Sequence, residues 1–170
     1  TNGGKAPEYY VQPVNLLDNS DFRNPVNQRG IASGQSISAY GYFIDRWRVS
    51  GDGLSDLTLS QNGLGLPNGS TIMQSVPDIR DGTVVTFAIG FSSGETFCVS
   101  GTINYTDNGE WLRLATGATD FGILFIDTYV GNVDCVIYCL AETTIQWAAL
   151  YEGSYTAETL PPYVPKGYAT

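Results

Sequence analysis

The sequence predicts an all-β domain, a jelly-roll-like β-sandwich of about eight or nine antiparallel strands. Short runs of β-branched and aromatic residues recur about every ten residues, and glycine or Asn-Gly turns separate them. No stretch shows the apolar spacing of a helix. The chain has 20 glycines among 170 residues and only 15% charged residues, a composition typical of short strands joined by tight turns.

The beginning of the chain predicts a linker followed by an ordered segment. Residues 1–14 hold a Gly-Gly pair, two prolines and no apolar period, as expected of a linker from an upstream region. From residue 15 to 170 we expect a single domain, long enough for a hydrophobic core. Its opening segment, Asn15–Gly30, is rich in Asn, Asp and Pro, which favour ordered turns over helix, and its apolar side chains are expected to fix it to the core: Leu16, Leu17, Phe22 and Val26.

The first strand is predicted at Tyr42–Val49, after a polar loop at Ile31–Ala39, and we expect it to lie beside the closing strand. Alternation puts Asp45 on the same face as Trp47, so this carboxylate is expected to pair with an arginine. Val84–Phe91 is a continuous apolar run, typical of a strand covered on both faces. A turn is predicted at Gly63–Gly69, and the other strands at Leu54–Gln61, Thr71–Val76, Glu95–Ile103, Trp111–Leu114, Phe121–Tyr129, Val133–Leu140 and Thr144–Tyr151.

Composition excludes several classes of function. The absence of histidine removes Ser-His-Asp and Cys-His nucleophile systems and most zinc sites, and no Gly-rich phosphate loop occurs. The net charge of −9 argues against nucleic acid or anionic lipid as partners, because both need clustered cations. No apolar run is long enough for membrane insertion and no signal peptide is visible. Because the chain begins with Thr1, we expect a fragment or a processed form.

The three cysteines are expected to be free thiols. Cys135 and Cys139 fall on one expected strand, about 13 Å apart along it, which is too far for a disulfide. Both are expected to face the core as small apolar side chains. A bridge from Cys98 to either of them stays open as an alternative.

Carboxylates are the remaining candidates for catalysis, since a glycosidase needs two of them across a cleft. Most fall in predicted turns, and we single out Asp45 and Asp127 as carboxylates within strands. We expect both to be structurally paired, so the domain is expected not to be an enzyme. No cofactor or metal is expected. A structural calcium ion in a loop, as in jelly-roll carbohydrate-binding modules, is the alternative, at Asp18–Asp21 or Asp52–Asp56.

Aromatic side chains are the strongest candidates for a binding function, because sugars dock on flat aromatic faces with polar groups at their edges. The candidate ligand-binding residues are Trp111, Tyr105, Arg113, Tyr40 and Tyr42. Trp111 and Arg113 are two apart and share a strand face, Tyr105 lies across the preceding polar turn, and the other two tyrosines form a second cluster. The alternative is that Trp111 belongs to the core and that Tyr40 and Tyr42 cover a sheet edge. Two further tryptophans have apolar neighbours and are expected in the core, Trp47 and Trp147.

Two stretches also carry a resemblance to a known family. NLLDNSDFRNPVNQRG at Asn15–Gly30, followed by GYFIDRWRV at Gly41–Val49, resembles the start of the C-terminal domains of phage and prophage tail fibres and related tail structural proteins. IQWAALYEGSYTAETLPPYVPKGYA at Ile145–Ala169 resembles their closing segment, with its tryptophan strand, acidic-Gly turn and proline pair. The two matches bracket the domain, so the resemblance covers residues 15–169.

The resemblance implies a virion component, the distal and non-enzymatic domain of a phage tail fibre. Its expected task is host attachment through a receptor on the bacterial surface, which we interpret as a glycan. It also implies assembly in the cytoplasm of the bacterial host as a homotrimer, which would bring weak sites together for avidity, and contacts with other tail proteins through the N-terminal side. Two alternatives stay open: a structural tip or assembly domain that binds no sugar, and a small glycan-active enzyme.

Overall fold

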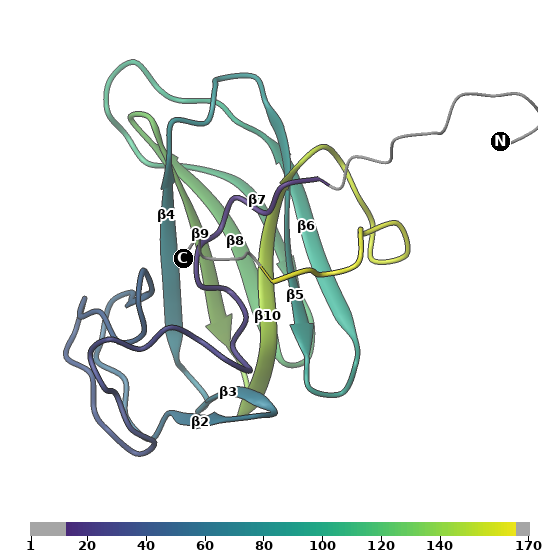
Figure 1. Cartoon of the computed structure of the whole chain (residues 1–170). Coiled ribbons are helices and arrows are strands. Elements are labelled where there is room, and N and C mark those ends of the chain that lie inside the picture. The colour runs from purple at the N-terminus through teal and green to yellow at the C-terminus, as the bar shows by residue number, and fades with distance from the viewer. Residues whose placement is uncertain (1–12, 166–170) are drawn as a thin grey trace, which may run out of the picture.

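The computed structural model describes residues 13–165 and is an all-β sandwich of two antiparallel sheets with five strands each (Figure 1). In the first sheet the strands are ordered β1 (Arg48–Val49), β4 (Thr71–Pro77), β9 (Asn132–Cys139), β8 (Gly122–Tyr129) and β7 (Leu112–Ala118). In the second sheet the order is β2 (Thr58–Ser60), β3 (Gly63–Leu66), β10 (Thr143–Glu152), β5 (Val84–Phe91) and β6 (Thr96–Thr102). The described residues contain no helix that could cross a membrane.

The path of the chain confirms the predicted fold class. The chain passes from one sheet to the other between β1 and β2, β3 and β4, β4 and β5, β6 and β7, and β9 and β10. Hairpins within one sheet join β2 to β3, β5 to β6, and β7 through β8 to β9. Repeated crossing between two facing sheets is the feature that a jelly roll shares with this domain.

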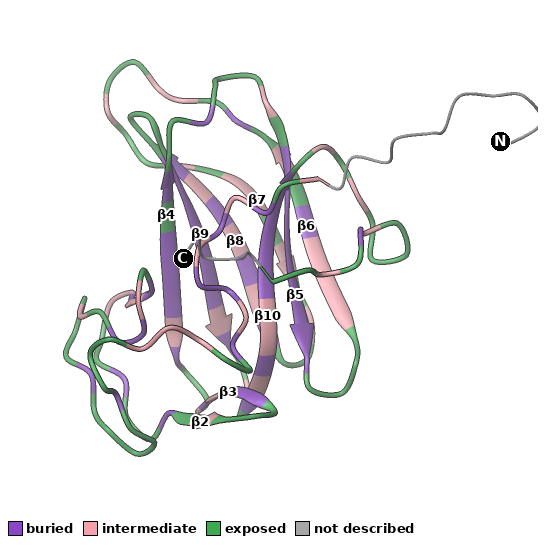
Figure 2. Ribbon diagram, in the orientation of Figure 1, coloured by how far each residue is buried: buried purple, intermediate pink, exposed green. Residues whose placement is uncertain are grey.

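The core lies between the two sheets and is built by alternation. On β8, Leu124 and Ile126 point inward and are almost completely buried, whereas the residues between them are half exposed. On β5, Val85, Phe87 and Ile89 point inward from the opposite sheet and are also buried. Burial of one such side chain contributes about 1.5–3 kcal/mol. Figure 2 shows the result: buried residues line β4, β5, β9 and β10, and the loops at both ends of the sandwich are mostly exposed.

The prediction of a strand over Tyr42–Val49 was wrong for most of its length. Phe43 donates from its backbone N–H to the Trp47 carbonyl at 3.1 Å, and Arg46 has a φ of +73°, so the segment folds into a tight turn. The reason is burial, because the adjacent side chains of Phe43 and Ile44 are both 0% exposed, which a half-buried strand cannot achieve. Only Arg48–Val49 forms a strand, and it pairs with β4 in the first sheet and not with the closing strand β10.

The turn predicted at Gly63–Gly69 was wrong in its first half, because Gly63–Leu66 forms β3. Leu64 and Leu66 are buried in the core, and β3 pairs with β10. Gly65 is needed for packing, since a Cβ at this position would collide with the Thr58 hydroxyl of β2. The glycines that indicate a turn in the sequence therefore allow a close strand contact here.

The opening segment extends the second sheet along the free part of β10. Leu16 N–H donates to the Leu150 carbonyl at 2.8 Å, and Phe22 N–H donates to the Gln146 carbonyl at 2.8 Å. Asn15 is buried and fixes this contact with its side-chain amide, which accepts from the Leu150 N–H at 3.0 Å. The prediction that this segment is ordered and attached to the core is confirmed, since Leu17 and Phe22 are 0% exposed.

A C-terminal arm, residues 153–165, covers the outer face of the second sheet and is the yellow segment that crosses β10 and β5 in Figure 1. Thr86 Oγ1 donates to the Gly153 carbonyl at 2.8 Å and accepts from the Tyr155 N–H at 3.0 Å. Further along, Tyr163 stacks on Trp147 with ring centroids 5.0 Å apart. Trp147 therefore lies on the outer face under the arm, and its expected place in the core was wrong.

Candidate functional site

The outer face of the first sheet is the candidate site, and we call it the open face. Residues on it remain exposed, including Ser75 on β4, Arg113 and Thr116 on β7, and Tyr129 on β8. This contrasts with the outer face of the second sheet, where Thr86 is 0% exposed under the C-terminal arm.

Alternation on β8 decides which side chains reach the open face. Leu124, Ile126 and Thr128 are buried between the sheets, so Phe125, Asp127 and Tyr129 point outward. The alternation of these three residues is visible in the sequence. Their neighbours on the face depend on how β8 is aligned with β7 and β9, which the sequence does not show.

The strand register places four polar residues in a row across the open face: Ser75, Asp134, Asp127 and Arg113. Ser75 Oγ donates to Asp134 Oδ1 at 2.6 Å. Arg113 forms a two-pronged ion pair with Asp127, with Nε donating to Oδ1 at 2.7 Å and Nη2 to Oδ2 at 3.3 Å. The expected structural pairing of Asp127 is confirmed, and the row offers both charges and a hydroxyl in fixed positions.

Asp134 is the most buried member of this row, with 3% exposure. Burial raises the pKa of its carboxyl above the ordinary value, and the neighbouring Asp127 adds to this rise. The Ser75 hydrogen bond and the positive charge of Arg48 act in the opposite direction. The row therefore contains one carboxyl with a raised pKa beside one that is ion-paired.

Arg113 is held by a second contact, since its guanidinium carbon lies 3.9 Å from the centroid of the Phe125 ring. A cation over an aromatic face contributes about 0.5–1 kcal/mol at an exposed site. Together with the Asp127 ion pair, this contact fixes the guanidinium although half of the side chain is exposed. The orientation of Arg113 is therefore set before any ligand arrives.

Trp111 is exposed and does not belong to the core. Its side chain is 60% exposed and stacks on Tyr129, with ring centroids 4.7 Å apart and an angle of 26° between the rings. Two turns position this pair. One is the loop before Trp111, which Thr106 Oγ1 closes by donating to the Glu110 carbonyl at 2.9 Å, and the other is the β8–β9 turn at Gly131. Trp111 and Arg113 thus lie together at one border of the open face, as the sequence predicted.

Tyr105 does not join the Trp111–Tyr129 stack, because its hydrogen bonds hold it against residues 79–81. Its hydroxyl donates to the Ile79 carbonyl at 2.6 Å, and its backbone N–H donates to Asp81 Oδ1 at 2.9 Å. Burial raises the pKa of the phenol, and the charges of Asp81 and Asp78 raise it further. Tyr105 is half-buried and anchors the loop to the core.

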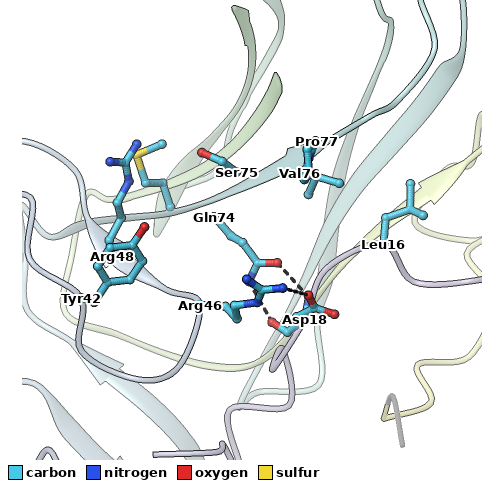
Figure 3. A pocket seen from close by; sticks show the side chains of 10 residues that line it. Leu16, Asp18, Tyr42, Arg46, Arg48, Gln74, Ser75, Val76 and Pro77 are labelled. Atoms are coloured by element: carbon cyan, nitrogen blue, oxygen red, sulfur yellow. Dashed lines mark hydrogen bonds and ion pairs between the residues drawn. The ribbon is translucent and has the colours of Figure 1, made fainter. Parts of the chain in front are cut away.

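The tyrosines of the second predicted cluster are both exposed, at 66% for Tyr40 and 49% for Tyr42. Tyr42 lines a hollow of about 170 Å³ at the β4 border of the first sheet, together with Arg48 and Ser75 (Figure 3). Tyr42 also lines a wider, more open hollow of about 1000 Å³ with Arg29, and Asp18 and Arg46 line both hollows. We call the two adjoining hollows the Tyr42 groove.

Two other predictions concern carboxylates of the loops. Within residues 13–165, Asp45 has no arginine at ion-pair distance, so the expected pairing was wrong. Its Oδ1 accepts from the Gln28 backbone N–H at 2.9 Å, and water reaches this half-exposed carboxylate. At residues 18–21, one of the two loops considered for the alternative of a calcium ion, Asp18 pairs with Arg46 at 3.3 Å and Asp21 with Arg23 at 3.0 Å. No group of three or more His, Cys, Asp or Glu side chains among the described residues is placed to hold a metal.

The three cysteines are free thiols in the structure. Cys135 and Cys139 are buried in the core, as expected, and Cys98 lies half-buried under the C-terminal arm. The predicted linker falls almost entirely on residues 1–12, outside the described residues.

No family model, no curated protein and no solved structure matches this chain. The site therefore rests on the geometry of the described residues alone. Sequence reasoning missed Tyr129, Phe125, Asp134 and Ser75 as members of it. Alternation around Asp127 indicates Tyr129 and Phe125. Asp134 and Ser75 belong to the site only because cross-strand register places them beside Asp127.

Proposed function

We propose that this protein is the distal, non-enzymatic domain of a phage or prophage tail fibre, and that its open face binds a glycan of the bacterial surface through Trp111 and Tyr129. The observation that carries the proposal is the Trp111 side chain, 60% exposed yet fixed by stacking at the border of a polar sheet face. An exposed aromatic ring is unfavourable in water, because its apolar surface remains hydrated. Packing the ring against a sugar would remove this free-energy cost.

The surroundings of Trp111 supply what a sugar needs beside a flat ring. Arg113 offers N–H donors, Asp127 offers acceptors, and Ser75 offers a hydroxyl on the same face. Because the Arg113 and Asp127 charges are paired, this part of the face suits a neutral, hydroxyl-rich ligand. Side chains that are already held in place lose little conformational freedom on binding, which favours affinity.

The resemblance of Asn15–Val49 and Ile145–Ala169 to the C-terminal domains of tail fibres supports the wider role. Attachment in the virion would use several copies of the domain, and a homotrimer would join three weak sites. Other tail proteins would contact its N-terminal side. The alternative from another class, a structural tip domain for assembly, has the same fold and differs in having no ligand on the open face.

One observation favours a second function, that of a small glycan-active enzyme. Asp127 and Asp134 are direct cross-strand neighbours, and such pairs have Cβ atoms about 4.5–5.5 Å apart. Retaining glycosidases also use two neighbouring carboxyl groups, about 5–5.5 Å apart. Release of sugar from a bacterial polysaccharide that is abolished by Asp127→Asn would favour this function over simple binding.

The test is a glycan array followed by titration, with the domain displayed as a trimer. We expect Trp111→Ala to weaken binding at least about tenfold, because truncation of an aromatic that dominates an interface costs about 2 kcal/mol or more. Phe121→Ala is the matched control, since Phe121 is a 43% exposed aromatic residue at the other end of β8. If the trimeric protein binds no glycan, the receptor proposal fails and the assembly domain is favoured.

A further inference from the structure

The Tyr42 groove gathers positive charge in an acidic protein. Arg29, Arg46 and Arg48 line its two hollows, which is three of the eight Lys and Arg residues in a chain of net charge −9. Two carboxylates, Asp18 and Asp45, share the lining. The groove therefore has an excess of cations, although the protein as a whole has an excess of anions.

The two carboxylates are already engaged within the protein. Asp18 pairs with Arg46 at 3.3 Å, as drawn in Figure 3, and Asp45 accepts the Gln28 N–H. Within residues 13–165, neither Arg29 nor Arg48 has a carboxylate within ion-pair distance. Arg29 lies over the Tyr42 ring, with its guanidinium carbon 5.5 Å from the ring centroid. The backbones of Tyr42 and Arg48 pair at an isolated bridge, and both residues line the smaller hollow.

The backbone that presents these side chains has an unusual conformation. Tyr40 has a φ of +58° and Arg46 a φ of +73°, in the left-handed region that non-glycine residues rarely adopt. The turn is held by two backbone hydrogen bonds of Trp47, whose side chain is 0% exposed and donates its indole N–H to the Asn19 carbonyl at 3.0 Å. Strained residues that the surrounding structure holds in place cluster at ligand-binding sites.

We propose that the Tyr42 groove is a second ligand site, for a saccharide that carries a negatively charged group, either a carboxylate or a phosphate. The Tyr42 ring supplies a flat surface for the sugar. Arg29 and Arg48 supply fork-shaped donors that match the two oxygens of a carboxylate or phosphate. The groove shares Ser75 with the polar row of the open face, but Tyr42 and its arginines lie across the sheet from Trp111. Binding in the groove therefore does not depend on glycan binding at Trp111.

The test is calorimetric titration of the protein with three probes: an oligogalacturonate, a sugar phosphate and the uncharged oligosaccharide matched to the first. We expect the charged probes to bind and the uncharged one not to bind in this groove. The affinity should fall at least fivefold in Arg29→Ala and Arg48→Ala, and it should weaken as salt increases. Arg80→Ala is the matched control. Arg80 is an exposed arginine on the β4–β5 connection, outside the groove, so this substitution removes the same charge without touching the proposed site.

The outcomes separate the two sites. Charged-probe binding that is lost in Arg29→Ala and Arg48→Ala but kept in Trp111→Ala supports the second site, and the tighter probe identifies carboxylate or phosphate as the natural group. The inference is overturned if neither charged probe binds, if Arg80→Ala weakens binding as much as the groove variants, or if the uncharged oligosaccharide competes equally well.

Discussion

Replacement of Asn15 by alanine tests how the opening segment is attached to the sandwich. The Asn15 amide makes four hydrogen bonds. Its Oδ1 accepts from the N–H groups of Leu17 and Leu150, each at 3.0 Å, and its Nδ2 donates to Ser20 Oγ at 2.9 Å and the Ala148 carbonyl at 3.2 Å. Leu17, Ala148 and Leu150 are 0% exposed, so water does not reach their backbone groups.

The magnitude follows from the groups that lose their partner. Asn15→Ala leaves three buried backbone groups unsatisfied, and each costs about 1–3 kcal/mol. Ser20 keeps a second partner, the Tyr163 hydroxyl at 3.2 Å, and adds little. We therefore expect a loss of about 4 kcal/mol in the free energy of unfolding. For a domain of this length, that corresponds to a fall of roughly 8–16 °C in Tm.

The assay is urea unfolding at pH 7, with Asn27→Ala as the matched control. Asn27 makes two hydrogen bonds to Ile31 within one half-exposed turn, at 2.8 and 3.0 Å, and its loss should cost only about 0.5–1.5 kcal/mol. The amide proton of Leu150 should also exchange faster in Asn15→Ala. A difference of less than about 1 kcal/mol between the two variants would refute the role of Asn15.

Two further predictions concern buried acidic groups. A raised carboxyl pKa means that folding favours the protonated form, so the contribution of Asp134 to stability is fully present below the ordinary value of 3.8 and is lost as pH rises through the higher folded pKa. Asp134→Asn should therefore be more stable than the wild type at pH 7 and should lose this advantage near pH 3, and a less stable variant at pH 7 would contradict this. Of the three thiols, Cys98 alone should react with a disulfide reagent in the native protein. Cys135 and Cys139 are at most 1% exposed. Burial also raises the thiol pKa of both, that of Cys139 to about 12, so neither forms the reactive thiolate readily. Cys98→Ser should abolish the native reaction, and a second native thiol that reacts equally fast would show that the core opens.

The sequence predicted the fold class well because alternation and turn chemistry are local signals. Val84–Phe91 and the strand from Thr71 were placed within a residue or two of β5 and β4. Tyr42–Val49 failed because its composition suits a strand, whereas burial of adjacent side chains in the core requires a turn. Such a tertiary demand overrides local propensity, and it is invisible in the segment itself.

The candidate site was predictable only in part. Trp111 and Arg113 were found because they share a strand face and follow a polar turn, features that are local. The polar row from Ser75 to Arg113 joins residues from four strands, and strand register brings them together. The groove around Tyr42 depends on a left-handed residue, Arg46, and no sequence pattern indicates an arginine in that conformation.

The position of β10 has a consequence for the order of folding. This strand lies in the middle of the second sheet, between β3 and β5, although it is the last strand along the chain. During synthesis, β3 and β5 emerge long before the strand that lies between them. The hydrogen bond from Leu150 to Asn15 cannot form until a residue 135 positions later has been made. Contacts so distant in sequence slow folding, and unpaired strand edges invite association between chains. The nascent domain is therefore most vulnerable to aggregation until Thr143–Glu152 has been made.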